Sequence, residues 1–327
     1  MIIITNMYSI DEKDRKILEE LDKDCRKTDS EIAKRVGLSK QVVNYRIKRL
    51  IESGLITDFY TVINIGKLGL NSHYIFLQLE KINKEQEEKL IEKLRSLNYI
   101  GWLVSGTGRW DIILLIYANS LSEFEELLTK TLSICKNHVH EYNFATLISA
   151  EHISYKFLSK TKGDYGAKQT EKQVFTPLEN KDKKILEGIS QNARISVVEL
   201  SNKTKIPIYV IRYHIKNLLK EKIIGGFKPK ININKLGLQW HLLLLQLQNI
   251  SKERKKEFIN FCKQHNKIYY VTNVIGLYNI MLDIHVKNTE EFKEVLFELK
   301  EKFSDIIRLY ESVIIFEEYK INYFPNT

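Results

Sequence analysis

The segment Ser39–Leu50, with the sequence SKQVVNYRIKRL, combines amides, cations and an aromatic ring on one predicted helix. If Val43, Ile47 and Leu50 turn inward, a rotation of about 100° per residue places the remaining positions on the exposed side. Amide side chains hydrogen-bond the edges of bases and cations bind phosphates, so this mixture suits a nucleic acid. The outward positions are Gln41, Tyr45, Lys48 and Arg49, with Lys40 and Asn44 near the exposed amino-terminal end of the helix.

Three short helices are predicted to position this segment. Thr28 and Glu31 have the spacing of a capping box, which starts the second helix. Gly37 then allows a tight turn, and Ser39 caps the third helix. This is helix-turn-helix spacing. The alternative interpretation is an amphipathic surface helix with a solvated basic face, but the complete three-helix pattern favours DNA binding.

The whole pattern occurs twice in the 327 residues. The motif KDRKILEE from Lys13 returns as KDKKILEG from Lys181, and INIGKLGL from Ile63 returns as ININKLGL from Ile231, an offset of 168 residues in both cases. A single internal duplication explains this. We predict a helix-turn-helix domain at residues 10–62, a ferredoxin-like domain at 63–158, a polar linker at 159–176, a second helix-turn-helix domain at 178–230 and a second ferredoxin-like domain at 231–325.

The fold class predicted for each copy is α+β. After the three helices, segments with strand and helix periodicity alternate in the order β-α-β-β-α-β. This order is typical of a ferredoxin-like fold, an antiparallel sheet with two helices on one face. The other face carries apolar runs such as YIFLQL and LLLLQL. We expect the two copies to cover these faces by packing on each other within the chain, as a pseudo-dimer.

The first copy resembles the Lrp/AsnC, or feast/famine, transcription regulators, through LDKDCRKTDSEIAKRVGLSKQVVNYRIKRLIESGLITDF and SGTGRWDIILLI. The resemblance extends over nearly the whole chain, once per copy. It implies a winged helix-turn-helix that binds DNA and a second domain for dimerisation, higher assembly and amino-acid sensing. It also implies a recognition helix at Ser39–Leu50, in which Lys40, Gln41, Asn44, Tyr45 and Arg46 touch DNA. Many members have Pro at the position of Lys40 and Arg at that of Tyr45, so the base preference does not transfer.

The second helix-turn-helix departs further from this pattern. Lys205 replaces the turn glycine, and Pro207 replaces the capping serine, although proline is tolerated at a helix start. Residues 178–228 contain 11 basic and 5 acidic residues, against 12 and 11 in residues 10–60, which favours phosphate binding. We predict two working DNA-binding units, the alternative being a degenerate second copy. The candidate contacts of the second copy are Tyr209, Arg212, Tyr213, His214 and Lys216, with Asn217 on the same face.

A glycine-containing loop is the candidate effector site. The resemblance places it at Gly106, Gly108 and Asp111, where backbone N–H groups would meet a carboxylate and the aspartate would meet an ammonium group. Gly276 and Asn279 are the corresponding residues of the second copy, which therefore lacks the acidic partner. The alternative is a plain hairpin turn. SGTGRW has no lysine followed by serine or threonine, so it is no phosphate-binding P-loop.

Composition limits the remaining classes. There is no apolar run of 18 residues and no secretion signal, and the three cysteines have no CxxC spacing, so we expect a cytoplasmic protein with no membrane partner. A net charge of +10 suits DNA. We predict no catalytic residues, no metal and no cofactor beyond an amino-acid effector, and we interpret CKNHVH at Cys135–His140 as structural. The sequence leaves open whether several chains assemble into a higher homo-oligomer. The rival classes are an architectural DNA-binding protein and a siroheme decarboxylase-like enzyme.

Overall fold

The computed structural model describes residues 7–152, 155, 158, 167–169 and 175–324. Each helix of the first half except η2 returns 168 residues later, as the internal repeat predicts. The first-half helices are α1 (Glu12–Lys23), α2 (Asp29–Val36), α3 (Lys40–Glu52), η1 (Ile65–Leu68), α4 (Lys84–Ser96) and α5 (Leu121–Cys135), the last followed by η2 (Lys136–His138). Their counterparts are α6 (Asn180–Gln191), α7 (Val197–Thr204), α8 (Ile208–Lys220), η3 (Ile233–Leu236), α9 (Lys252–Gln264) and α10 (Thr289–Phe303).

The strands follow the same repeat. The first half contains β1 (Ile56–Ile63), β2 (Asn71–Leu79), β3 (Ile100–Thr107), β4 (Ile112–Ala118) and β5 (Val139–His152), with a short β6 (Ala167–Gln169) after them. The second half contains β7 (Ile224–Ile231), β8 (Gln239–Leu247), β9 (Ile268–Gly276), β10 (Ile280–Val286) and β11 (Ile307–Ile321). The predicted α+β class, with a helix-turn-helix followed by a β-α-β-β-α-β unit in each copy, is confirmed.

Local signals account for the helix boundaries around the turn. The Thr28 side chain accepts from the Glu31 N–H, and the Glu31 carboxylate accepts from the Thr28 N–H, so the predicted capping box is present. Gly37 ends α2 in the left-handed region at φ 69°, and the Ser39 hydroxyl caps α3. In the second copy Lys205 takes up the same left-handed conformation at φ 59°, a position where a side chain costs free energy.

The two ferredoxin-like units form one closed barrel. Hydrogen-bonded strands follow the order β2-β4-β3-β11-β8-β10-β9-β5, and pairing of β5 with β2 closes the ring. All pairings are antiparallel, and the two halves meet at the seams β3–β11 and β5–β9. The sheets therefore share edges as well as apolar faces, which the sequence pattern did not indicate.

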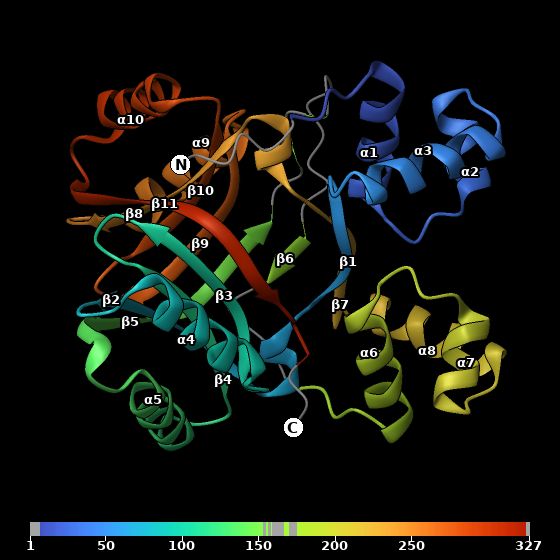
Figure 1. Ribbon diagram of the computed structural model, residues 1–327, viewed down its shortest axis with the longest axis horizontal. Coiled ribbons are helices and arrows are strands. Elements are labelled where there is room, and N and C mark those ends of the chain that lie inside the picture. Colours follow the sequence, from blue (N-terminus) through green and yellow to red (C-terminus); the bar gives the residue numbers. More distant parts are fainter. Residues whose placement is uncertain (1–6, 153–154, 156–157, 159–166, 170–174, 325–327) are drawn as a thin grey trace.

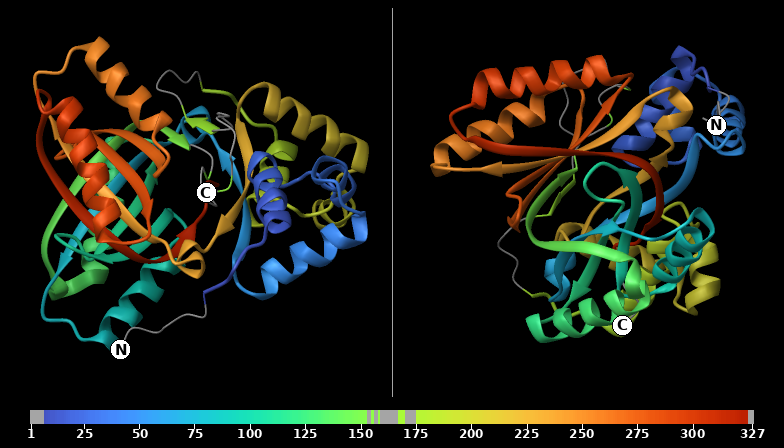
Figure 2. Two further views of the ribbon diagram at one scale, coloured as in Figure 1. Left: turned by 90° about the horizontal axis from the view of Figure 1, so that it is seen from above. Right: turned by 60° about the vertical axis from the view of Figure 1, so that its left-hand side comes forward.

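Helices cover the outside of this barrel. In Figure 1, α9 and α10 lie above it and α4 and α5 below it, and the second orientation in Figure 2 shows the same two layers. Strand side chains alternate accordingly: in β10, Leu282 and Ile284 pack against α9 and α10, while Met281 belongs to the barrel interior. Each half thus has its own helix-facing core, and the two halves share the interior core.

The helix-turn-helix units lie together on the right of Figure 1. We call residues 10–62 headpiece 1 and residues 178–230 headpiece 2. Their strands β1 and β7 pair with each other in a two-stranded antiparallel ribbon. Arg26 donates to the Ala193 carbonyl at 2.6 Å, and Arg194 donates to the Cys25 carbonyl at 2.8 Å. These reciprocal bonds join equivalent positions, so the headpieces are related by a pseudo-twofold axis.

The predicted linker, residues 159–176, lies largely outside the described residues. Within the part that is described, residues 167–169 form β6 on the edge of β5, although the sequence showed no strand pattern there. The Thr176 N–H donates to the Lys67 carbonyl at 2.9 Å. Across the residues that the structure describes, no helix is long and apolar enough to span a membrane.

Candidate nucleic-acid interface

Helix α3 presents a polar surface to solvent. Val43, Ile47 and Leu50 are buried against the rest of headpiece 1, as the wheel predicts. The exposed candidates are Ser39, Lys40, Gln41, Asn44, Tyr45 and Lys48, and the Tyr45 ring is 65% exposed. In the described part of the chain neither Lys40 nor Lys48 forms a salt bridge, so both ammonium groups can reach an anionic partner. Asn44 donates to the Asp29 carboxylate at 2.8 Å and is engaged within the headpiece.

Helix α8 repeats part of this surface. Tyr213 and Lys216 occupy the positions of Tyr45 and Lys48, and the Tyr213 ring is 63% exposed. Tyr209 and Arg212 are exposed on the same face, whereas Asn217 is only half exposed. Both helices therefore share an exposed tyrosine followed three residues later by an exposed lysine, and differ at the positions around this pair.

Two of the predicted cations turn back onto α1. Arg46 pairs with Asp11 and with the buried Asp14, each at 2.7 Å, and Arg49 pairs with Asp14 at 2.7 Å. The Arg46 side chain is only 15% exposed. These pairs secure α3 to α1, so the two guanidinium groups meet a phosphate only if they leave or share their carboxylates.

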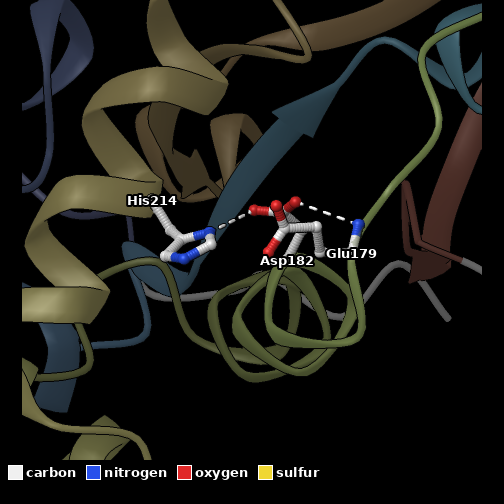
Figure 3. A group of neighbouring side chains, drawn as sticks. All are labelled: Glu179, Asp182 and His214. Atoms are coloured by element: carbon white, nitrogen blue, oxygen red, sulfur yellow. Dashed lines mark hydrogen bonds and ion pairs between the residues drawn. The ribbon is translucent and has the colours of Figure 1, made fainter.

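His214, a predicted DNA contact, occupies the position of Arg46 in the second copy and, like Arg46, turns toward the preceding helix. The side chain is buried in α8, and its Nδ1 lies 2.7 Å from the Asp182 carboxylate, as Figure 3 shows. Asp182 also accepts the backbone N–H of Glu179 at 3.1 Å. His214 thus holds α8 on α6, just as Arg46 holds α3 on α1.

Glu179, Asp182 and His214 form the one group of three possible metal ligands among the described residues. Figure 3 shows that Asp182 is already used by the imidazole and by the helix cap. The contacts between α6 and α8 therefore account for the placement of these three side chains.

The predicted effector loop is part of the barrel seam. A Cβ at Gly106 would lie 2.5 Å from the Ile314 carbonyl oxygen, and one at Gly276 would lie 2.5 Å from the Phe144 carbonyl oxygen. Gly108 is similarly close to the Ser312 carbonyl oxygen, at 2.5 Å. These glycines allow the close strand approach that joins the two halves, which is a packing reason for their presence.

The polar residues of the loop have matching structural roles in both copies. The Asp111 carboxylate accepts the Leu79 N–H at 2.7 Å, and the Asn279 side-chain oxygen accepts the Leu247 N–H at 2.6 Å. An aspartate and an asparagine serve equally as acceptors here. The exchange of Asp111 for Asn279 between the copies therefore preserves this contact while removing a charge.

Sequence reasoning missed a polar cluster inside the barrel. Asp283 and His285 line a cavity there, where the first copy has Leu115 and Tyr117. The sequence did contain a signal for this cluster, because Asp and His occur at inward strand positions of the second copy where the first copy has Leu and Tyr.

These features define a class of protein. A family model described as winged helix-turn-helix DNA-binding matches residues 10–57 and 178–224, the two headpieces. The chain is thus a protein with two winged helix-turn-helix DNA-binding units on an α+β assembly.

Relatives narrow this class to a family. The chain is 35% identical over 123 residues to an uncharacterised HTH-type transcriptional regulator of Pyrococcus furiosus, covering 38% of this chain and 82% of that protein. It is 31% identical over 125 residues to the HTH-type transcriptional regulator LrpA of Pyrococcus horikoshii, covering 38% and 86%. The regulatory protein AsnC of Haemophilus influenzae is 29% identical over 128 residues, covering 39% and 85%. The chain belongs to the Lrp/AsnC family.

A solved structure matches both halves at once. The siroheme decarboxylase NirDL superposes with a TM-score of 0.63 at 14% identity, covering 97% of this chain and 95% of that chain. At this identity the match shows that the two proteins share a fold over their full length.

Proposed function

We propose that the chain is a sequence-specific transcription regulator in which the two halves act as an intrachain pseudo-dimer. The observation that carries this proposal is the exposed pair of tyrosine and lysine on each recognition helix: Tyr45 with Lys48, and Tyr213 with Lys216. Residues 10–62 and 178–230 are the DNA-binding domains. Residues 63–158 and 231–325 form the assembly that holds them, and residues 159–176 connect the halves.

The proposal predicts an asymmetric DNA site. Gln41 and Asn44 of α3 are replaced by Tyr209 and Arg212 in α8, so the two helices offer different groups to base edges. Headpieces related by a pseudo-twofold axis would meet major-groove faces about one helical turn apart. Selection of bound sequences from random DNA should therefore return two unlike half-sites at fixed spacing. Recovery of a perfect palindrome would contradict the proposal.

An architectural role is the rival within DNA binding. The cationic surface of headpiece 2 supports it, because phosphate contacts carry no sequence information. In that case the selection would return no shared sequence, and a footprint would extend over any duplex offered.

An amino-acid effector at Gly106, Gly108 and Asp111 is the second part of the proposal, with Gly276 and Asn279 as the weaker equivalent. It rests on family membership, since the seam geometry explains the glycines without a ligand. A panel of amino acids should raise the melting temperature or change DNA affinity for one member. If no amino acid does so, the loop is a structural hairpin.

An enzyme like the siroheme decarboxylase is the alternative that the shared fold supports. Purified protein with a haem-like absorption band, and loss of carboxylate groups from siroheme on incubation, would favour it. Colourless protein that leaves siroheme unchanged would favour the regulator.

A further inference from the structure

The barrel encloses a cavity of about 110 Å³ at the end that faces the β1–β7 ribbon. Aromatic rings make a large part of its wall, among them Tyr74, Trp102, Trp240, Tyr269 and Tyr270. Eight-stranded barrels have an interior that is either filled by side chains or holds one small ligand. The volume is of the order of the engineered cavity, about 150 Å³, that binds benzene.

The cavity lies on the pseudo-twofold axis, because its lining includes both members of several equivalent pairs. Leu115 and Tyr117 of β4 face Asp283 and His285 of β10 across it. The ionisable wall comes from the second half: Lys230, Asp283, His285 and Glu318 stand where the first half has Val62, Leu115, Tyr117 and Ala150. A dimer of two identical subunits would place the same residue on both sides of the cavity. A wall that is charged on one side only therefore needs two different halves, as in this duplicated and diverged chain.

Most charges on this wall are already neutralised. The Glu318 carboxylate pairs with Lys230 at 3.0 Å and accepts the Trp102 indole N–H at 2.6 Å. His285 is stacked with Tyr269 at 4.9 Å between centroids, and burial lowers the pKa of its imidazole to about 3, so it is neutral at pH 7.

Asp283 is the exception. One carboxylate oxygen accepts the Trp240 indole N–H at 2.7 Å, and no cation pairs with this carboxylate among the residues that the structure describes. The side chain is buried, and the loss of solvation raises its pKa to about 7. With Asp283 ionised, the three charged groups sum to one negative charge, which favours a cation and disfavours an anion.

A surface groove adjoins this wall of the cavity. This groove of about 700 Å³ shares Lys230, Trp240 and Glu318 with the cavity lining. The Lys230–Glu318 pair lines both the cavity and the groove, and its two side chains are 22% and 14% exposed.

We propose that the barrel cavity binds a small organic monocation, a protonated amine on a flat apolar body of about one ring, with its ammonium group on Asp283 and its body among the aromatic rings. The aromatic faces add cation–π attraction at a desolvated site. This inference does not depend on DNA binding and concerns a place distinct from the loop at Gly106.

Calorimetric titration of the full chain at pH 8 with three probes of one size tests the proposal: benzylammonium, benzyl alcohol and phenylacetate. Benzylammonium should bind about 10- to 100-fold more tightly than benzyl alcohol, the factor expected for a charge-assisted hydrogen bond, and phenylacetate should not bind. Equal binding of the cation and the alcohol, or no saturable binding of the cation, would overturn the proposal. This comparison uses the unaltered protein and needs no variant.

Variants then locate the site. Asp283→Asn keeps an oxygen acceptor for Trp240 and should lose the preference for benzylammonium. Asp305→Asn removes an exposed carboxylate that pairs with Arg254 of α9 and does not line the cavity, so it should keep the preference. Retention of the preference in Asp283→Asn would refute the assignment. Displacement of benzylammonium by iron-uroporphyrin would also refute it, in favour of a tetrapyrrole site.

Discussion

Removing the shared lysines from the two recognition helices should lower the salt dependence of DNA binding. Lys48 and Lys216 are exposed, have no salt-bridge partner in the described structure, and occupy equivalent positions. Each phosphate contact contributes about 0.9 to the slope of log K against log salt. Lys48→Ala or Lys216→Ala should therefore reduce the slope by about 0.9, and the double variant by about 1.8. The affinity that each variant loses relative to the unaltered chain should therefore be roughly 3- to 4-fold smaller at 200 mM than at 50 mM salt.

Fluorescence anisotropy with one selected duplex and one unrelated duplex, over a series of salt concentrations, measures these slopes. Lys256→Ala in α9 is the matched control, because it removes an exposed lysine from the helix layer of the barrel. Its slope should equal that of the unaltered chain. If the double variant at Lys48 and Lys216 also keeps the original slope on both duplexes, the assignment of α3 and α8 as DNA-contacting helices is refuted.

Three further outcomes follow from the structure. Gly106→Ala should lower the free energy of unfolding by about 2–3 kcal/mol, since its Cβ would lie 2.5 Å from a backbone oxygen of β11. Gly37→Ala, whose Cβ would have no atom within 4 Å, should lower it by only about 1 kcal/mol, and chemical denaturation measures both variants. Because the raised pKa of Asp283, about 7, makes the folded state bind a proton between pH 4 and 7, its contribution to stability is lost as pH rises through that window. Relative to Asp283→Asn, the unaltered chain should lose about 2–3 kcal/mol of unfolding free energy between pH 5 and 8, and a difference that stays constant with pH would show that the pKa of Asp283 is not raised. Arg26→Ala with Arg194→Ala should weaken the join between the headpieces, seen as faster amide hydrogen exchange in β1 and β7, and unchanged exchange there would contradict the reciprocal contacts.

Local patterns in the sequence predicted the elements well. The capping box at Thr28, the turn at Gly37 and the apolar spacing of α3 each depend on residues within one or two helical turns, and all were found. Strand periodicity likewise indicated the order of elements in both ferredoxin-like units. The repeat itself shows which positions are equivalent, and all helices and strands except η2 and β6 follow it.

Features that depend on distant partners were not predicted. The helical wheel of α3 placed Arg49 outward, and the family resemblance gave Arg46 a DNA contact, but their acidic partner Asp14 lies on another helix, more than 30 residues earlier. Strand edges that join the two halves, and the cavity between them, are set by the pairing of whole sheets, which periodicity does not encode. The sequence did contain a signal for these ion pairs. The positions equivalent to Asp14 and Arg46 in the second copy are Asp182 and His214, so an acidic and a basic residue occur together in both copies.

The reciprocal join between the headpieces also affects how the protein behaves at low abundance. Separate subunits dissociate when diluted below their dissociation constant, and they exchange with related chains in the same cell. Here Arg26 and Arg194 bind halves of a single polypeptide, so the local concentration of each half around the other is fixed by the chain. In the proposed intrachain pseudo-dimer, the pairing of the two halves would therefore not depend on how many copies of the chain a cell contains.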